Sequence, residues 1–137
     1  MKQSMIKAAR GLWMAFPMIL GTVLLVSLIS AVVPKSFYLM VFSKNIFLDS
    51  VVGSLVGSIS AGNPVTSYIF GGEMLSQGVG LIAVTAFLIA WVTVGIIQLP
   101  AESAILGKKF ALLRNITAFV LAIVVAILTV LILGVVV

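Results

Sequence analysis

The chain has 137 residues, of which 63% are hydrophobic and 8% are charged, and its mean hydropathy is +1.38. Because about a quarter of the residues of a soluble domain are charged, this composition excludes a separate soluble domain and predicts a single membrane domain over residues 1–137. The net charge is +5, but the cations flank apolar runs, so the membrane surface explains them better than nucleic acid does.

Cysteine and histidine are both missing from the sequence. Their absence excludes disulfides and thiolate metal sites, and it removes the commonest general base and metal ligand. The sequence also contains no phosphate-binding loop and no pair of carboxylates at metal-ligand spacing. We therefore predict that the protein is not an enzyme and that it uses no metal and no cofactor.

The first apolar run, residues 11–33, carries no charge. It exceeds the roughly 20 residues that a transmembrane helix needs, and Pro17 falls in its first two turns, where a proline is tolerated best. A cleaved signal peptide is the alternative, but the apolar core of such a peptide has only about 7 to 15 residues. The run therefore predicts a transmembrane helix that ends at Pro34, followed by an aromatic segment suited to the membrane interface.

A second helix is predicted from Ile46 to Ala61. Small side chains recur along it at every fourth residue, which lets helices approach closely in lipid. We expect this helix to be buried among other helices, with the packing made by two rows of residues: Ser50, Ser54 and Ser58, and Gly53, Gly57 and Ala61.

The triplet Gly62-Asn63-Pro64 then interrupts the helix, because Pro64 disfavours the helical conformation of the residue before it. The stretch 65–76 forms a helix of only about 18 Å, too short for a hydrocarbon core of about 30 Å. The segment 46–77 therefore reads as a broken helix or re-entrant hairpin. If both of its parts cross the membrane instead, the chain has five helices.

Two more transmembrane helices are predicted over residues 79–99 and 116–137, with Pro100 ending the first of them. The predicted fold is thus an all-α integral membrane protein with about three full transmembrane helices and one broken hairpin. Between these helices lies a short connection, whose cations are Lys108, Lys109 and Arg114.

The positions of the cations predict the topology. Three cations precede the first helix and three lie in the connection after residue 99, whereas only Lys35 and Lys44 stand between. If both larger clusters face the cytoplasm, an even number of crossings must separate them, and helices 11–33 and 79–99 supply two. We therefore predict a multi-pass protein of the plasma membrane with a cytoplasmic N-terminus. The parity also holds for five helices.

The helix break is the candidate binding site. Freed backbone groups in a membrane need protein or water as partners, and broken helices in transporters expose such groups to polar substrates and ions. An intramembrane carboxylate is a functional hypothesis by default, although a glutamate near the membrane surface is simply solvated. The predicted solute- or ion-binding residues are Asn63, Pro64, Thr66, Ser67, Glu73 and Gln98.

Two stretches, "AGNPVTSYIFGGEML" and "FLIAWVTVGIIQLPAESAILGKKFALLRN", together with the closing apolar run, resemble predicted permeases related to the organoarsenical efflux permeases. The resemblance covers roughly residues 50 to 135 and depends on Asn63-Pro64 combined with the connection from Leu106-Gly107 to Arg114. Such permeases have two related halves, each with a broken helix, so the resemblance implies a half-length member that needs a partner. The missing cysteine argues against arsenical export.

These observations predict a permease-like half-transporter that moves a small solute or ion as a homo-oligomer, most simply a dimer, with the Asn-Pro break lining the pathway. The alternative is a non-transporting membrane scaffold or a subunit of a larger membrane complex. The expected partners are the lipid bilayer, a second copy of the chain and the transported solute, but not nucleic acid.

Overall fold

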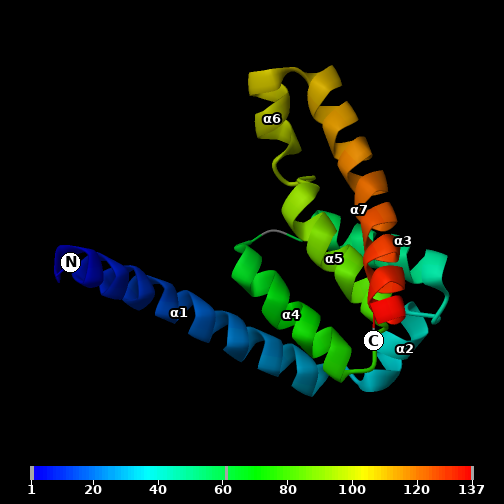
Figure 1. Ribbon diagram of the computed structural model, residues 1–137, viewed down its shortest axis with the longest axis horizontal. Coiled ribbons are helices and arrows are strands. Elements are labelled where there is room, and N and C mark those ends of the chain that lie inside the picture. The colour runs from blue at the N-terminus through cyan, green and yellow to red at the C-terminus, as the bar shows by residue number, and fades with distance from the viewer. Residues whose placement is uncertain (1, 61, 137) are drawn as a thin grey trace. The chain divides into compact units, whose positions relative to one another are not determined.

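A computed structural model describes residues 2–60 and 62–136. Ala61, one of the predicted packing residues, lies outside the described residues. Every regular element in the described part of the chain is a helix (Figure 1), as the composition predicts. The helices are α1 (Lys2–Val32), α2 (Lys35–Val41), α3 (Ile46–Ile59), α4 (Pro64–Ser76), α5 (Leu81–Thr93), α6 (Leu99–Leu106) and α7 (Lys108–Val136).

The chain divides into two compact units, Met1–Pro34 and Lys35–Val137. The first unit is the single helix α1, which contains the predicted run 11–33 and begins earlier, at Lys2. Pro17 lies inside this helix. The segment Gln3–Val32 is long and apolar enough to cross a membrane.

In the second unit, α7 meets the same criterion over Lys108–Gly134. Helices α2 and α3 together are long and apolar enough for a third span, but the chain bends by 113° between them, so the pair is either a broken span or a re-entrant loop. The described residues thus hold two helices of membrane-spanning length, or three spans with the bent pair. This is coarser than the predicted three full helices and one hairpin.

The turn between α2 and α3 is held by side chains at the start of α3. The Asn45 side chain caps the helix by accepting a hydrogen bond from the backbone N–H of Phe47 at 3.1 Å. Asp49, in the first turn, is 4% exposed and accepts a 2.9 Å hydrogen bond from the Ser43 backbone N–H. Asn45 thus satisfies a donor that the first turn of α3 leaves free, whereas Asp49 fixes the connection that precedes the helix.

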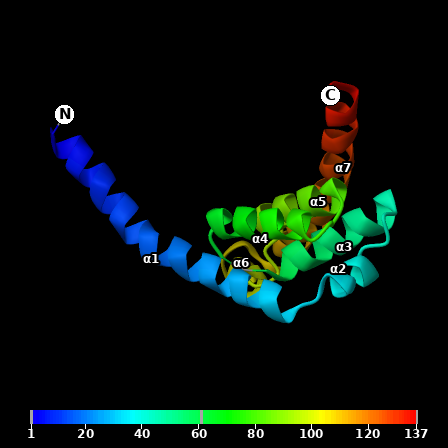
Figure 2. The ribbon, with the colours of Figure 1, turned by 90° about the horizontal axis from the view of Figure 1, so that it is seen from below.

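Helices α3 and α5 pack side by side and form the centre of the second unit (Figure 2). A Cβ at Gly53 would collide with the backbone oxygen of Ala83, and a Cβ at Gly57 with that of Phe87. The contact advances four residues along both helices, so α3 and α5 run parallel. Two backbones can approach this closely only where side chains are missing.

Helix α4 returns the chain between these parallel helices and packs on α5. Pro64 occupies its first turn, and the Asn63 side chain accepts a 2.9 Å hydrogen bond from the Val65 backbone N–H. A proline fits there because the first turn of a helix does not use its N–H groups. The Phe70 ring of α4 lies 6.1 Å from the Trp91 ring of α5, measured between centroids.

The helix predicted over 79–99 is wrong in its bounds. Helix α5 ends at Thr93, and residues 94–98 form an extended segment and a turn before α6 begins at Leu99. Thirteen residues make a helix of about 20 Å, so α5 alone is shorter than the hydrocarbon core of about 30 Å. Pro100 lies in the first turn of α6, where its missing N–H is not needed, and its ring disfavours a helix that continues through residue 96.

Helices α5 and α6 both pack on α7, which runs back past them (Figure 1). The predicted connection before residue 116 is also wrong, because α7 begins at Lys108 and only Gly107 separates it from α6. Gly107 has a φ of 90°, a backbone conformation that glycine adopts without strain. The cations at 108, 109 and 114 therefore lie on the first turns of α7.

Candidate functional site

The two helix breaks of the second unit meet at one small cavity. Its volume is about 70 Å³, and both the α3–α4 break and the α5–α6 break contribute to its wall together with one residue of α7. The lining residues are Ser60, Gly62, Trp91, Val92, Thr93, Val94, Gly95, Ile97, Gln98 and Arg114. Segments that are about thirty residues apart in the sequence thus face a shared polar space.

On one side of the cavity, the backbone leaves the helical conformation at Ser60 (φ −80°, ψ 140°). The Ser60 backbone N–H donates to the Gly57 oxygen at 3.1 Å, which closes the end of α3. Gly62 has a φ of 156°, and a Cβ there would lie 3.2 Å from the Trp91 ring. A residue without a side chain is therefore needed where the break meets α5.

Trp91 forms the wall between the two breaks. Its ring lies edge-on to Phe87 at a centroid distance of 5.3 Å, and its Nε1–H donates a long, 3.4 Å hydrogen bond to the Gly62 oxygen. An indole pairs an apolar face with one polar N–H. Trp91 can therefore pack against aromatic neighbours and contact the break at the same time.

On the other side, Val94 takes an extended conformation (φ −100°, ψ 121°), and its N–H closes α5 by donating to the Ala90 oxygen at 2.8 Å. The next N–H, that of Gly95, donates to the Asn115 side-chain oxygen at 2.8 Å. Asn115 lies on α7 and is 5% exposed. A side chain of α7 thus supplies the partner that a broken helix requires.

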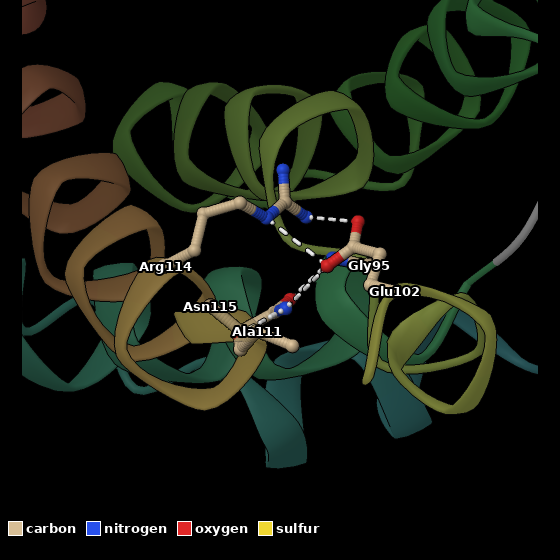
Figure 3. A network of polar contacts seen from close by, with 5 residues as sticks. All are labelled: Gly95, Glu102, Ala111, Arg114 and Asn115. Carbon is tan, nitrogen blue, oxygen red and sulfur yellow. Dashed lines mark hydrogen bonds and ion pairs between the residues drawn. The ribbon is translucent and has the colours of Figure 1, made fainter. Parts of the chain in front are cut away.

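Asn115 uses its amide nitrogen as fully as its oxygen. The nitrogen donates to the Ala111 oxygen at 2.9 Å, within α7, and to Glu102 Oε2 at 3.1 Å. The amide thereby joins α7 both to the break and to α6, as Figure 3 shows. Both of its donors and its acceptor are bonded, so Asn115 fixes the relative position of three segments.

Glu102 and Arg114 complete this network (Figure 3). Arg114 donates from Nε to Glu102 Oε2 at 3.1 Å, and its Nη2 lies 2.7 Å from Oε1. This two-point geometry is the strong form of an arginine–carboxylate pair. The Glu102 side chain is 18% exposed and the Arg114 side chain is 38% exposed, so the pair is accessible from one side.

The predicted site residues of the Asn-Pro break play mostly local parts. Asn63 and Pro64 start α4, and Ser67, which is 1% exposed, donates to the Pro64 oxygen at 2.6 Å. The Thr66 backbone N–H donates to the Asn63 oxygen at 2.9 Å. Gly62 lines the cavity, whereas these four residues are not among its lining residues.

Of the other two predicted residues, one lines the cavity and one does not. Gln98 lines the cavity. Glu73 lies in the last turns of α4, about 15 Å along the helix from Asn63, and accepts a 2.8 Å hydrogen bond from Gln77 Nε2. Gln98 therefore shares the cavity with Ser60 and Gly62 of the break before Asn63, whereas Glu73 does not line it.

The described members of the two small-residue rows, Ser50, Gly53, Ser54, Gly57 and Ser58, are all buried on α3. Ser58 donates its hydroxyl to the Ser54 oxygen at 2.6 Å. The Ser54 hydroxyl is buried without a hydrogen-bond partner in the described part of the structure. The glycines bring α3 onto α5, so these residues build the scaffold behind the cavity.

The sequence analysis missed Asn115 and gave Arg114 no part in the site. Both lie within a long apolar helix, where a polar residue is expensive and usually has a specific partner. That cost was the available signal. The partner, Gly95, was hidden because residue 95 was placed inside a continuous helix.

The cavity can hold a few water molecules or one small polar ligand. A buried water occupies one probe-sized space and needs two to four polar partners, and both breaks offer such groups. The site has no cysteine or histidine that could bind a metal or act as a nucleophile. Comparison of the chain with protein-family models, with curated proteins and with solved structures gave no match.

Proposed function

We propose that the protein is a permease-like half-transporter that moves a small solute or ion across the membrane through a pathway that includes the 70 Å³ cavity. The single observation that carries the proposal is that two helix breaks face each other across this cavity. A break in a membrane helix frees backbone groups that need partners, and here two breaks place such groups around one space.

Transport provides that reason. Discontinuous helices in secondary transporters place helix ends and unwound backbone around a polar solute. Here α3 and α5 end at the cavity and α4 and α6 begin beside it. Helix ends of both polarities thus surround one space, and their dipoles can act on a charged solute.

The proposal includes a homo-oligomer, most simply a dimer in the plasma membrane. The described residues provide two helices of spanning length, or three spans with the bent pair, which is few for enclosing a pathway. Large apolar side chains also face outward along α7, among them Leu113, Leu121 and Ile132, each more than half exposed. These faces suit lipid or a second copy of the chain.

Flux through reconstituted protein tests the proposal. Liposomes containing the purified protein are loaded with sodium, potassium, chloride, nitrate or phosphate, and release is followed with ion-selective electrodes. The decisive variant is Gly95→Val, because a Cβ at Gly95 lies 3.1 Å from Gln98 Oε1 and 3.5 Å from Arg114 Nη2. The new side chain fills the cavity without removing any charge.

The matched control is Gly72→Val, because a Cβ at Gly72 has no atom within 4 Å other than the adjacent backbone of its own helix. We expect flux of at least one of these ions above that of empty liposomes, lost in Gly95→Val and kept in Gly72→Val. Equal flux in both variants would remove the cavity from the pathway. Intact assembly without flux of any of these ions would favour a scaffold or a subunit of a larger complex.

A further inference from the structure

We infer that the cavity between the two helix breaks binds a small monovalent anion, of the size of chloride or nitrate, through the guanidinium of Arg114 and the side-chain amide of Gln98. The inference names the substrate class of the proposed transport site and depends on that proposal for its physiological meaning. Binding itself is a separate property that can be measured without transport.

The charges around the cavity favour an anion. Among its lining residues Arg114 carries the only charge, and no carboxylate belongs to the lining. Glu102 approaches Arg114 outside that lining and holds the guanidinium by Nε and Nη2. The carboxylate of Glu102 therefore positions the arginine, and the positively charged guanidinium lines the cavity.

The guanidinium has donors left for a ligand. It carries five N–H groups, and two of them bond Glu102. The terminal nitrogen that points away from the carboxylate in Figure 3 forms no hydrogen bond with any described residue. Arginine presents such donors in a rigid fork, which suits a planar oxyanion as well as a spherical one.

Gln98 places its side-chain amide at the same position, and a half-turn of that amide presents a second donor. Gln98 Oε1 and Arg114 Nη2 lie 3.1 Å and 3.5 Å from the position of a Cβ at Gly95, so both polar groups flank this glycine. An amide presents either its oxygen or its NH₂ group after a half-turn. The hydroxyl groups of Ser60 and Thr93 already donate to the oxygens of Val56 and Ile89 and add no donor.

The size of the cavity limits the ligand. Pockets for organic ligands usually measure about 300–1,000 Å³, whereas this cavity measures about 70 Å³. It has room for a few water-sized bodies, so its volume suits a small inorganic ion better than a sugar, an amino acid or a lipid tail.

The surroundings favour the approach of an anion. Lys108 and Lys109 begin the helix that carries Arg114, and Glu102 is the acidic residue of the neighbouring helix α6. Three cations and one carboxylate give this end of the α6–α7 pair a net charge of +2. Such a field raises the local concentration of anions near the cavity.

Trp91 provides the measurement because it lines the cavity. In a Trp13→Phe background, Trp91 is the sole tryptophan of the chain. The full chain in detergent is titrated with sodium chloride and sodium nitrate, with sodium gluconate as the large-anion control and choline chloride to exchange the cation. We expect a saturable change in Trp91 fluorescence with chloride and nitrate, independent of the cation, and none with gluconate.

Three variants test the residues. Arg114→Gln should weaken chloride binding by at least about tenfold, because a bond to a charged donor is lost. Lys109→Gln removes the same charge nearby, outside the described lining, and should weaken binding less than about threefold. Gly95→Val, which keeps every charge, should abolish the signal.

Saturation that follows sodium or choline rather than the anion would overturn the inference, as would equal binding by Arg114→Gln and by the unchanged chain. Persistence of the signal in Gly95→Val would overturn it as well, even if Arg114→Gln fails to fold. Chloride binding without flux in liposomes would support the anion site and reject the transport proposal. Flux that does not change when chloride or nitrate is added, or when Arg114 is replaced by Gln, would support transport and reject the anion site.

Discussion

The side-chain oxygen of Asn115 accepts a 2.8 Å hydrogen bond from the backbone N–H of Gly95, twenty residues earlier in the chain. This bond satisfies a donor that the end of α5 leaves free, and the same amide also bonds Glu102 at 3.1 Å. One buried amide therefore connects the break between α5 and α6 to the long helix α7. The stability of the break should depend on it.

Asn115→Leu replaces this amide by an apolar side chain of similar volume. Because the Gly95 N–H then loses its partner, we expect the free energy of unfolding to fall by about 1–3 kcal/mol. Unfolding by denaturant in mixed micelles measures the change. Thr129→Val is the control, because the exposed Thr129 hydroxyl donates to the Val125 oxygen of its own helix. A loss of similar size in the control would contradict the assigned role of Asn115.

Gly53→Ala tests the contact between α3 and α5. The added Cβ would collide with the backbone oxygen of Ala83, so the helices must separate, and overpacking of this kind costs about 1–3 kcal/mol or more. Gly72→Ala is the matched variant, since a Cβ there meets no atom within 4 Å and alanine favours a helix by about 1 kcal/mol. Thermal stability in detergent should therefore fall in the first variant and be kept or rise in the second.

Ser54→Ala should not destabilise the protein, although Ser54 is fully buried. Its hydroxyl has no partner in the described structure, and removal of an unsatisfied polar group recovers part of its desolvation cost, on the order of 1 kcal/mol. Ser67→Ala provides the contrast, because that hydroxyl donates to the Pro64 oxygen at 2.6 Å. Chemical unfolding of both variants checks the order. Greater loss at Ser54 than at Ser67 would mean that Ser54 has a partner, such as water.

Asn63 can be tested for capping and for transport separately. Asn63→Ala removes the acceptor for the Val65 N–H and should cost about 1 kcal/mol of stability, whereas Asn63→Ser keeps a capping oxygen and should cost little. If Asn63 only caps α4, the flux per folded molecule stays the same in both variants. A serine variant that is stable but has lost flux would show that the amide contacts the solute.

Some features could be predicted from the sequence because their causes are local. Pro64 ends a helical run by its own ring geometry, so the break before α4 was placed within a few residues. The burial of Ser50 and Gly53 followed from a four-residue spacing that any helix converts into one face. The length of the charge-free apolar runs predicted the two helices of membrane-spanning length, α1 and α7.

Other features depend on contacts between distant segments. Pro100 was read as the end of the helix, but α5 stops at Thr93 because the next segment finds partners on α7. The charge-free run that hid this break also hid the role of Asn115. Glu73 was predicted as a site residue because carboxylates are rare in membrane helices, yet the charged pair that adjoins the cavity is Glu102 with Arg114. Local patterns locate possible breaks, whereas tertiary contacts decide which of them form a site.

The parallel arrangement of α3 and α5 also sets an order of assembly. During synthesis the glycine and serine face of α3 emerges first, and its packing partner follows only after the whole of α4. Two parallel neighbours cannot be joined by a tight turn, so α3 has no early partner of its own. A nascent chain released before Leu81 therefore leaves α3 without the surface that buries its serines. The buried face of α3 can therefore be covered only once α5 has been synthesised.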